Sequence, residues 1–215
     1  MSTPPPTAQY DNLVSDYDQW FVDNAAIVAS EFDALRQVLP DFDNALEVGV
    51  GTGFFADELG IHNGIDPSVK MLERARDRGI RVEQASAEDL PYDDDTFDAV
   101  FFITVDGYID LPAALAEAKR VLTSDGTLVV GMLDWDTPVG AERKASHANS
   151  PYFAGISFRS SVDMVAALQA AGFTVNETRQ TVFNWADDLS NPFDKQEVRE
   201  GVGDGYFAVL TARKA

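Results

Sequence analysis

Three glycines in a short stretch offer the clearest chemistry in this sequence. Gly49, Gly51 and Gly53 follow an apolar run that contains Glu47, and helical spacing begins directly after them. Glycine lets the backbone adopt positive φ and approach a ligand closely, while a helix start offers unpaired amides and a positive dipole. Such a loop can hold a dinucleotide or another nucleoside cofactor. Dinucleotide binders follow Gly-x-Gly-x-x-Gly, whereas this chain has Phe54 in the place of the third glycine.

Four further segments follow this loop in order and at suitable distances. They are residues 64–72, 85–92, 96–100 and 118–122. Together with residues 46–53 they resemble the class I S-adenosylmethionine-dependent methyltransferases, in particular the small-molecule branch that includes the quinone-biosynthesis methyltransferases. The resemblance is close over residues 44–133 and loose elsewhere. It implies S-adenosylmethionine as the cofactor and transfer of its methyl group.

Asp66 ends the second predicted strand, 13 residues after Gly53. A carboxylate at this point can accept hydrogen bonds from both hydroxyl groups of a ribose. The same residue, ahead of Pro67, could instead cap the next helix, and both roles could coexist. The resemblance favours cofactor contact at Asp66 and Pro67.

The resemblance also implies how other residues meet the cofactor. Glu47 and the turn 49–53 would face its methionine part, and Met71 would pack on the adenine. Glu47 could instead bond nearby loop amides, and Met71 could belong to the core. Ala87 and Glu88 would meet the adenine edge.

Two more segments are expected to border the reacting methyl group and the cofactor. Residues 103–108, which include Thr104, follow the fourth strand and would lie beside the methyl group by resemblance. Tyr17 and Phe21 resemble part of an N-terminal helix that closes over the cofactor, although they equally form an apolar helix face.

Candidate groups for acid–base chemistry are few. Asp106 could accept a proton from the acceptor, or it could cap the following turn. His147 is a candidate general base because an unperturbed imidazole titrates near about pH 6.5, but a loop histidine is often only solvated. It lies in residues 134–158, a segment too long for an ordinary connection, which we predict to be a lid with aromatic residues toward the acceptor.

The elements that must hold these residues alternate between strands and helices. Strands are predicted at residues 45–50, 60–66, 80–85, 97–104, 127–133, 174–184 and 206–212, and helices at 53–59, 68–78, 111–122 and 160–171, after two helical pieces within 10–39. This alternation predicts an α/β, Rossmann-like, mostly parallel seven-stranded sheet with helices on both faces and an antiparallel terminal strand. Cofactors then bind at the carboxyl ends of the strands.

Length and composition limit the alternatives. The 215 residues favour one domain, residues 10–215, with a helical cap at 10–39 and a disordered tail at 1–9. The absence of cysteine and the wide separation of the two histidines argue against a metal site. A net charge of −20 disfavours nucleic acid as a partner. Without a membrane span or a signal peptide, we expect a cytoplasmic protein, as a monomer or homodimer.

The sequence therefore predicts a methyltransferase that acts on a small-molecule acceptor by in-line displacement. Two alternatives stay open: a non-catalytic S-adenosylmethionine-binding sensor or subunit, and a nicotinamide-dependent oxidoreductase. The acidic residues include 25 Asp and 11 Glu, and the basic ones 11 Arg and 5 Lys, a bias found both in salt-adapted and in ordinary acidic proteins.

Overall fold

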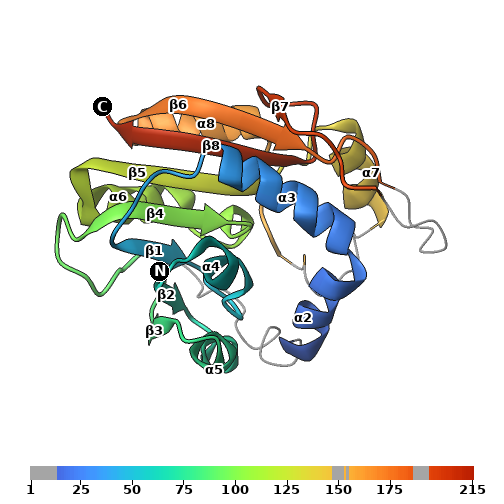
Figure 1. Ribbon diagram of the computed structural model, residues 1–215. Helices are drawn as coiled ribbons and strands as arrows, with labels where there is room; N and C mark the ends of the chain where they lie inside the picture. The colour runs from blue at the N-terminus through green and yellow to red at the C-terminus, as the bar shows by residue number, and fades with distance from the viewer. Residues whose placement is uncertain (1–13, 147–152, 154, 186–193) are drawn as a thin grey trace.

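The fold is a single twisted sheet with helices on both faces (Figure 1). The computed structural model describes residues 14–146, 153, 155–185 and 194–215. The strands are β1 (Ala45–Val48), β2 (Asn63–Asp66), β3 (Arg81–Gln84), β4 (Phe97–Ile103), β5 (Leu122–Leu133), β6 (Phe173–Thr181), β7 (Arg199–Glu200) and β8 (Phe207–Lys214). The helices are α2 (Val14–Asp23), α3 (Ala25–Gln37), α4 (Phe54–Leu59), α5 (Val69–Asp77), the 3-10 turn η1 (Asp106–Tyr108), α6 (Leu111–Val121), α7 (Pro138–Ser146) and α8 (Ser161–Ala170).

The strand order is β3-β2-β1-β4-β5-β8-β6-β7. The five strands from β3 to β5 are parallel, and β8, β6 and β7 continue the sheet in antiparallel pairing. The prediction of a mostly parallel Rossmann-like sheet with antiparallel C-terminal pairing is confirmed, and all seven predicted strands are present. The two-residue β7 is an eighth strand that the sequence did not predict, because two exposed charged residues carry no strand pattern.

Side chains of the central strand β4 alternate between two buried layers. Ala99, Phe101 and Ile103 pack with α3 and α4 on one face, while Val100 and Phe102 pack with α6 and α8 on the other. A strand buried on both faces reads as a continuous apolar run, as this one does. The predicted helices on both faces are thereby confirmed.

The N-terminal helical region forms two helices that meet at Asn24. The Asn24 side chain donates a hydrogen bond to the Trp20 carbonyl, 2.8 Å away, and α3 then runs to Gln37, three residues before Pro40. In Figure 1, α3 crosses the sheet and α2 lies beyond the edge toward which the parallel strands point. Residues 1–13, including the predicted tail, lie outside the described part of the chain.

The segment after β5 differs from the open loop that the sequence suggested. It contains the helix α7, whose entry is held by Thr137, which donates to the Asp134 carbonyl (3.0 Å) and accepts from the Gly140 amide (3.0 Å). Trp135 and Val139 are buried in the core. The predicted lid therefore begins as a packed part of the domain.

Asp134 joins this segment to α8. Its carboxylate accepts hydrogen bonds from the amide of Asp136 (3.1 Å), from the amide of Ser161 (3.1 Å) and from the hydroxyl of Ser161. The carboxylate is almost completely buried, so the protein supplies the hydrogen bonds that water otherwise provides. The start of α8 is thus fixed to the end of β5.

None of the helices in the described residues has the length and apolar character that a membrane crossing requires.

We expect Asp134→Ala to lower the free energy of unfolding by about 2–4 kcal/mol, because each buried donor left without a partner costs about 1–3 kcal/mol. Urea unfolding followed by circular dichroism measures this difference. The control is Asp136→Ala, which removes an exposed carboxylate but keeps the amide, and should change stability by less than about 0.5 kcal/mol. Equal losses of stability in the two variants would contradict a stabilising role for the hydrogen bonds of the Asp134 carboxylate.

Candidate functional site

A cavity of about 440 Å³ opens where the parallel strands end. Its walls include the residues that directly follow β1 and β4 and the last residues of β2 and β5, and α2 and α3 close it from the side. This is the edge at which parallel α/β sheets bind cofactors, and the volume lies within the range of about 300–1,000 Å³ of ligand sites. Most of the predicted site residues line it, namely Tyr17, Phe21, Gly49, Gly51, Asp66, Pro67, Met71, Ala87, Glu88, Thr104 and Asp106.

Two predicted cofactor residues do not line the cavity. Gly53 begins α4 at φ +80°, and a Cβ there would lie 2.4 Å from Ile80 Cδ1, so this glycine is needed for helix packing. Glu47 lies in β1 behind the loop and is only 2 % exposed. In this structure both residues shape the loop from behind, and their contact with the cofactor stays a prediction. His147 lies outside the described residues.

The front of the loop is built by the other two glycines. Gly49 and Gly51 have φ values of +73° and +52°, and a Cβ on Gly49 would lie 2.5 Å from Val105 Cγ2. These conformations suit glycine and bring the backbone to the cavity surface.

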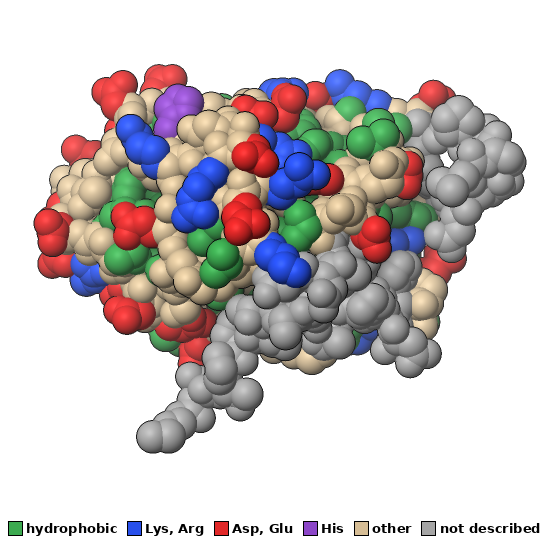
Figure 2. Space-filling model, turned by 90° about the horizontal axis from the view of Figure 1, so that it is seen from below, with side chains coloured by type: hydrophobic (Ala, Val, Ile, Leu, Met, Phe, Trp, Pro, Cys, Tyr) green, Lys and Arg blue, Asp and Glu red, His purple; other side chains and the backbone are tan. Residues whose placement is uncertain are grey.

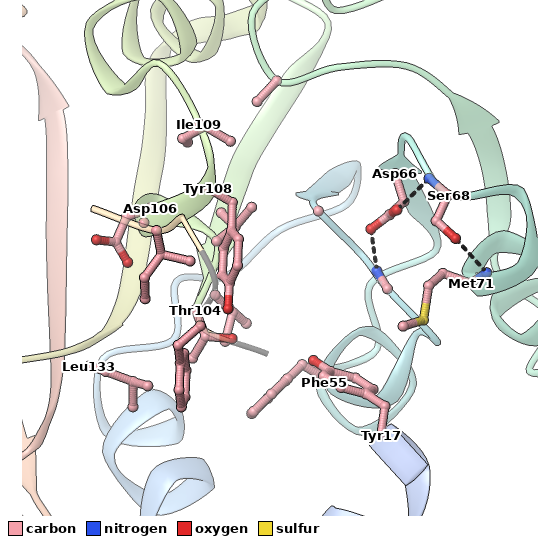
Figure 3. A pocket seen from close by; sticks show the side chains of 18 of the residues that line it. Tyr17, Phe55, Asp66, Ser68, Met71, Thr104, Asp106, Tyr108, Ile109 and Leu133 are labelled. Atoms are coloured by element: carbon pink, nitrogen blue, oxygen red, sulfur yellow. Dashed lines mark hydrogen bonds between the residues drawn. The ribbon is translucent and has the colours of Figure 1, made fainter. Parts of the chain in front are cut away.

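Asp66 fastens this loop to the next one. Its Oδ2 accepts a hydrogen bond from the Gly51 amide (3.0 Å) and its Oδ1 accepts one from the Ser68 amide (2.8 Å), as Figure 3 shows. The N-cap of α5 is Ser68, whose hydroxyl accepts from the Met71 amide (3.3 Å). The alternative that Asp66 itself caps the helix is therefore wrong, and its carboxylate lies on the cavity wall.

Burial alters the acidity of Glu47. Loss of solvation raises the pKa of the Glu47 carboxyl well above its usual value, the Ala56 amide partly offsets the rise, and the charge of Asp66 adds to it. Oε2 has no hydrogen-bond partner among the described residues. Glu47 thus leaves one polar atom unsatisfied beneath the glycine loop.

The wall after β4 is strained and polar. Thr104 has φ +53°, which a β-branched residue rarely adopts, and its amide donates to the Gly131 carbonyl (2.7 Å). Asp106 follows, 7 % exposed, with Oδ2 3.9 Å from Nε of Arg159. Burial raises the pKa of Asp106 to about 6, and the positive charge of Arg159 limits the rise.

Helix α2 is held against the glycine loop by aromatic packing and by arginine side chains beside Asp18. Phe21 stacks on Phe54, with ring centroids 3.9 Å apart. Arg78 donates to the Thr52 carbonyl (2.6 Å) and its Nη2 lies 3.2 Å from Oδ1 of Asp18. The cap over the cavity is thus tied to the glycine loop.

The far part of the cavity contains residues that the sequence analysis missed. Glu31, Arg143, Trp185 and Tyr206 all line it. Burial raises the pKa of Glu31 to about 8. One signal could have found Glu31: it interrupts the apolar face of a helix, between Ile27 and Leu35, where a charged residue is unexpected.

Comparison with known proteins agrees with this geometry. The methyltransferase domain family matches residues 46–130. A crystal structure from Thermotoga maritima, described as a SAM-dependent methyltransferase and possible histamine N-methyltransferase, is 33% identical, covers 97% of this chain and 99% of its own, and superposes with a TM-score of 0.90. The chain belongs to the S-adenosylmethionine-dependent methyltransferases.

Two sequence relatives extend the comparison. An uncharacterised protein of Methanocaldococcus jannaschii is 36% identical over 206 residues, which are 95% of this chain and 98% of the relative. A ubiquinone/menaquinone biosynthesis C-methyltransferase of Citrifermentans bemidjiense is 32% identical over 109 residues, 43% of this chain and 46% of the relative. The second match gives loose support to the predicted quinone-biosynthesis-like branch.

Glu31 should make stability depend on pH. An acid titrates near its ordinary value of 4.5 when unfolded but at about 8 when folded, so between these values the folded state holds the extra proton and stability falls as pH rises. We therefore expect Glu31→Gln to gain stability over the parent between pH 5 and 8, by a few kcal/mol, with no further change above pH 8. Urea unfolding of the parent and the variant at pH values from 5 to 9 measures the free energy of unfolding of each.

The control for that experiment is Asp33→Asn on the same helix, where the side chain is 35% exposed and pairs with Lys195. This variant should follow the parent at every pH. A stability difference between Glu31→Gln and the parent that does not vary with pH would contradict the assigned pKa.

Proposed function

We propose that this methyltransferase acts on a small molecule bound in the part of the cavity beyond the cofactor loop. The observation that carries the proposal is the continuity of one cavity, from Gly49, Gly51 and Asp66 to a wall of aromatic side chains. Trp20, Trp135, Phe153 and Trp185 belong to that wall. An enclosed apolar space with a few polar groups suits a small acceptor.

Other kinds of partner and activity have less support. A sensor would have its acceptor space filled, whereas this cavity is open. The family membership argues against a nicotinamide-dependent oxidoreductase. On the face shown in Figure 2, acidic side chains are spread among Lys and Arg, and with a net charge of −20 this does not favour a nucleic-acid acceptor. A monomer or homodimer is consistent with a site formed within one chain.

The residues present suit S-adenosylmethionine. Asp66 would accept hydrogen bonds from the ribose, and the backbone from Gly49 to Gly51 would follow the methionine part. Met71, Pro67, Ala87 and Glu88 line the same part of the cavity and would enclose the adenine. When bound, S-adenosylmethionine supplies an electrophilic methyl group on a positively charged sulfur.

The chain's own contribution is then mainly positioning. Alignment of two reactants can lower a barrier by up to about 7–11 kcal/mol. Tyr17 and Phe21 on α2, tied to the loop through Arg78, would exclude water from the reacting atoms. The described part of the predicted lid, residues 134–146, 153 and 155–158, would complete the cover, since Trp135, Arg143, Phe153 and Ile156 line the cavity.

Asp106 is the proposed proton acceptor. It borders the cavity directly after the strained Thr104, and with a pKa of about 6 it is mostly ionised at pH 7. A base with a pKa slightly below the working pH combines the correct protonation state with useful basicity.

We expect Asp66→Ala to weaken the binding of S-adenosylhomocysteine by about 1.5–3 kcal/mol, the usual size of a hydrogen bond to a charged group. Titration calorimetry measures the affinity, and NAD should give no binding. The control is Asp57→Ala, an exposed carboxylate on α4 that does not line the cavity. Unchanged affinity in the Asp66 variant would restrict its role to the protein's own loops, and saturable NAD binding would overturn the function.

We expect Asp106→Asn to lower kcat by about 10²–10⁴-fold. In the parent, kcat should fall as pH drops through about 6, because Asp106 becomes protonated, and the variant should lose this limb. The acceptor is found first by following cofactor consumption over phenols, quinones and amines. Asp110→Asn, at the exposed cap of α6, serves as control. An acid limb that persists in the Asp106 variant would assign it to another group.

A further inference from the structure

We propose that Glu31 binds a protonated amino group of the acceptor, so that the substrates are small molecules with an ammonium group as well as a separate nucleophile. This proposal rests on the proposed function, because it assigns the chemistry of the same acceptor space. Glu31 is a binding and specificity residue in this scheme and takes no part in the transfer itself.

The position of the Glu31 side chain suits a ligand-binding group. It lies on the buried face of α3, is 4 % exposed, and lines the cavity. No hydrogen bond to its carboxyl group comes from the described residues, and burial alone accounts for its raised pKa. A buried polar group without a partner lowers stability, a loss that a Leu at this position would avoid. A ligand that donates hydrogen bonds would remove that cost.

The surroundings favour a cationic ligand with an apolar body. Tyr206, Trp135 and Trp185 line the cavity together. The Tyr206 ring packs edge to face against both tryptophans, with ring centroids 5.4 Å apart for Trp135 and 6.1 Å apart for Trp185. Aromatic faces attract cations electrostatically, and the rings also supply apolar surface. One cation–π contact is already present here, because the Arg143 guanidinium lies 3.9 Å from the centre of the Trp185 ring.

Arg143 sets a limit on where the ammonium group can bind. Its charge and its hydrogen bond to the Tyr206 hydroxyl both act to lower the pKa of Tyr206, while burial and the charge of Glu31 raise it. Arg143 is therefore directed toward Tyr206 and Trp185. An incoming cation would be repelled by Arg143 and attracted by the Glu31 carboxylate on the same cavity wall, which we assign as its counter-ion.

The chemistry of the ammonium group defines the rest of the acceptor. A nitrogen that is protonated and paired with a carboxylate has no lone pair to attack a methyl group. The methylated atom must therefore be a second group on the same molecule. An aromatic or alkyl body of modest size would connect the two within the cavity.

Proton release gives a direct test. With an empty cavity, Glu31 is largely protonated at pH 7, and pairing with an ammonium group stabilises the carboxylate. Binding an amine at pH 7 should therefore release up to about one proton from Glu31 to the buffer. Of the other titratable groups that line the cavity, Tyr206 keeps its proton at this pH because burial raises its pKa, and Asp106 with a pKa of about 6 is already mostly ionised.

The experiment is titration calorimetry of the full chain saturated with S-adenosylhomocysteine, at pH 7 in phosphate and in Tris. The ligands are 2-phenylethylamine, 2-phenylethanol and 3-phenylpropanoate, which share a ring and differ in charge. We expect the amine to bind at least about tenfold more tightly than the alcohol or the acid, with proton release. Glu31→Gln should lose this preference and the proton release, whereas Asp33→Asn should keep both.

Failure of the proposed function and failure of the Glu31 assignment give different results in this experiment. Failure of the parent to bind S-adenosylhomocysteine would overturn the proposed function itself. With that binding intact, the inference about Glu31 is overturned if no probe binds, if the alcohol or acid binds as tightly as the amine, or if Glu31→Gln binds the amine like the parent. An equal loss of S-adenosylhomocysteine affinity in Glu31→Gln would assign Glu31 to the cofactor and would also overturn it.

Discussion

The site depends on one carboxylate that joins two loops. Asp66 ends β2, and its two oxygens accept hydrogen bonds from the Gly51 amide of one loop and the Ser68 amide of the next. The first loop needs positive φ at its glycines, and the second starts α5. Both conformations are therefore fixed relative to each other by a single side chain. The glycine loop, the helix α2 tied to it through Arg78, and the cavity between them all depend on this connection.

Burial raises the pKa of three carboxyl groups in this region: Glu31 and Asp106 line the cavity, and Glu47 lies beneath the glycine loop. Such groups reduce stability unless something satisfies them. Each has a different environment: Glu47 has the Ala56 amide, Asp106 has Arg159, and Glu31 has no donor among the described residues. The differences indicate different roles, with Glu47 beneath the loop, Asp106 in proton transfer as proposed, and Glu31 toward the ligand. Groups with perturbed acidity gather at functional sites for this reason.

The sequence predicted those elements of the fold that are determined by a pattern of neighbouring residues. The strands β1 to β5 are short apolar runs between helical patterns, and the glycine loop is a contiguous motif, so both are visible without the structure. The strand β7 depends on pairing with β6 over only two residues, Arg199 with Gln180 and Glu200 with Arg179. The helix α7 depends on contacts of Asp134 and Thr137. Neither element has a strong periodic pattern of its own, which is why the sequence did not indicate them.

The same distinction applies to the site. Asp66, the two front glycines and Asp106 were found because each stands at the end of a predicted strand, where a parallel sheet collects its functional groups. Glu31, Arg143, Trp185 and Tyr206 come from α3, α7 and the segments next to β6 and β8, and only the folded sheet brings them together. The local motifs thus predict which side of the cavity binds the cofactor.

The acceptor side is formed by elements that also hold the domain together. Trp135 is at once a core residue, a ring partner of Phe153 at 5.1 Å between centroids, and part of the cavity wall. The carbonyl of its neighbour Asp134 would lie 2.2 Å from a Cβ on Gly140, so α7 packs against this turn with no space to spare. Because interiors are close-packed, a change in the wall is transmitted to the core. Specificity for the acceptor is therefore expected to vary through single residues that face the cavity, such as Glu31, while the backbone of residues 134–146 is retained.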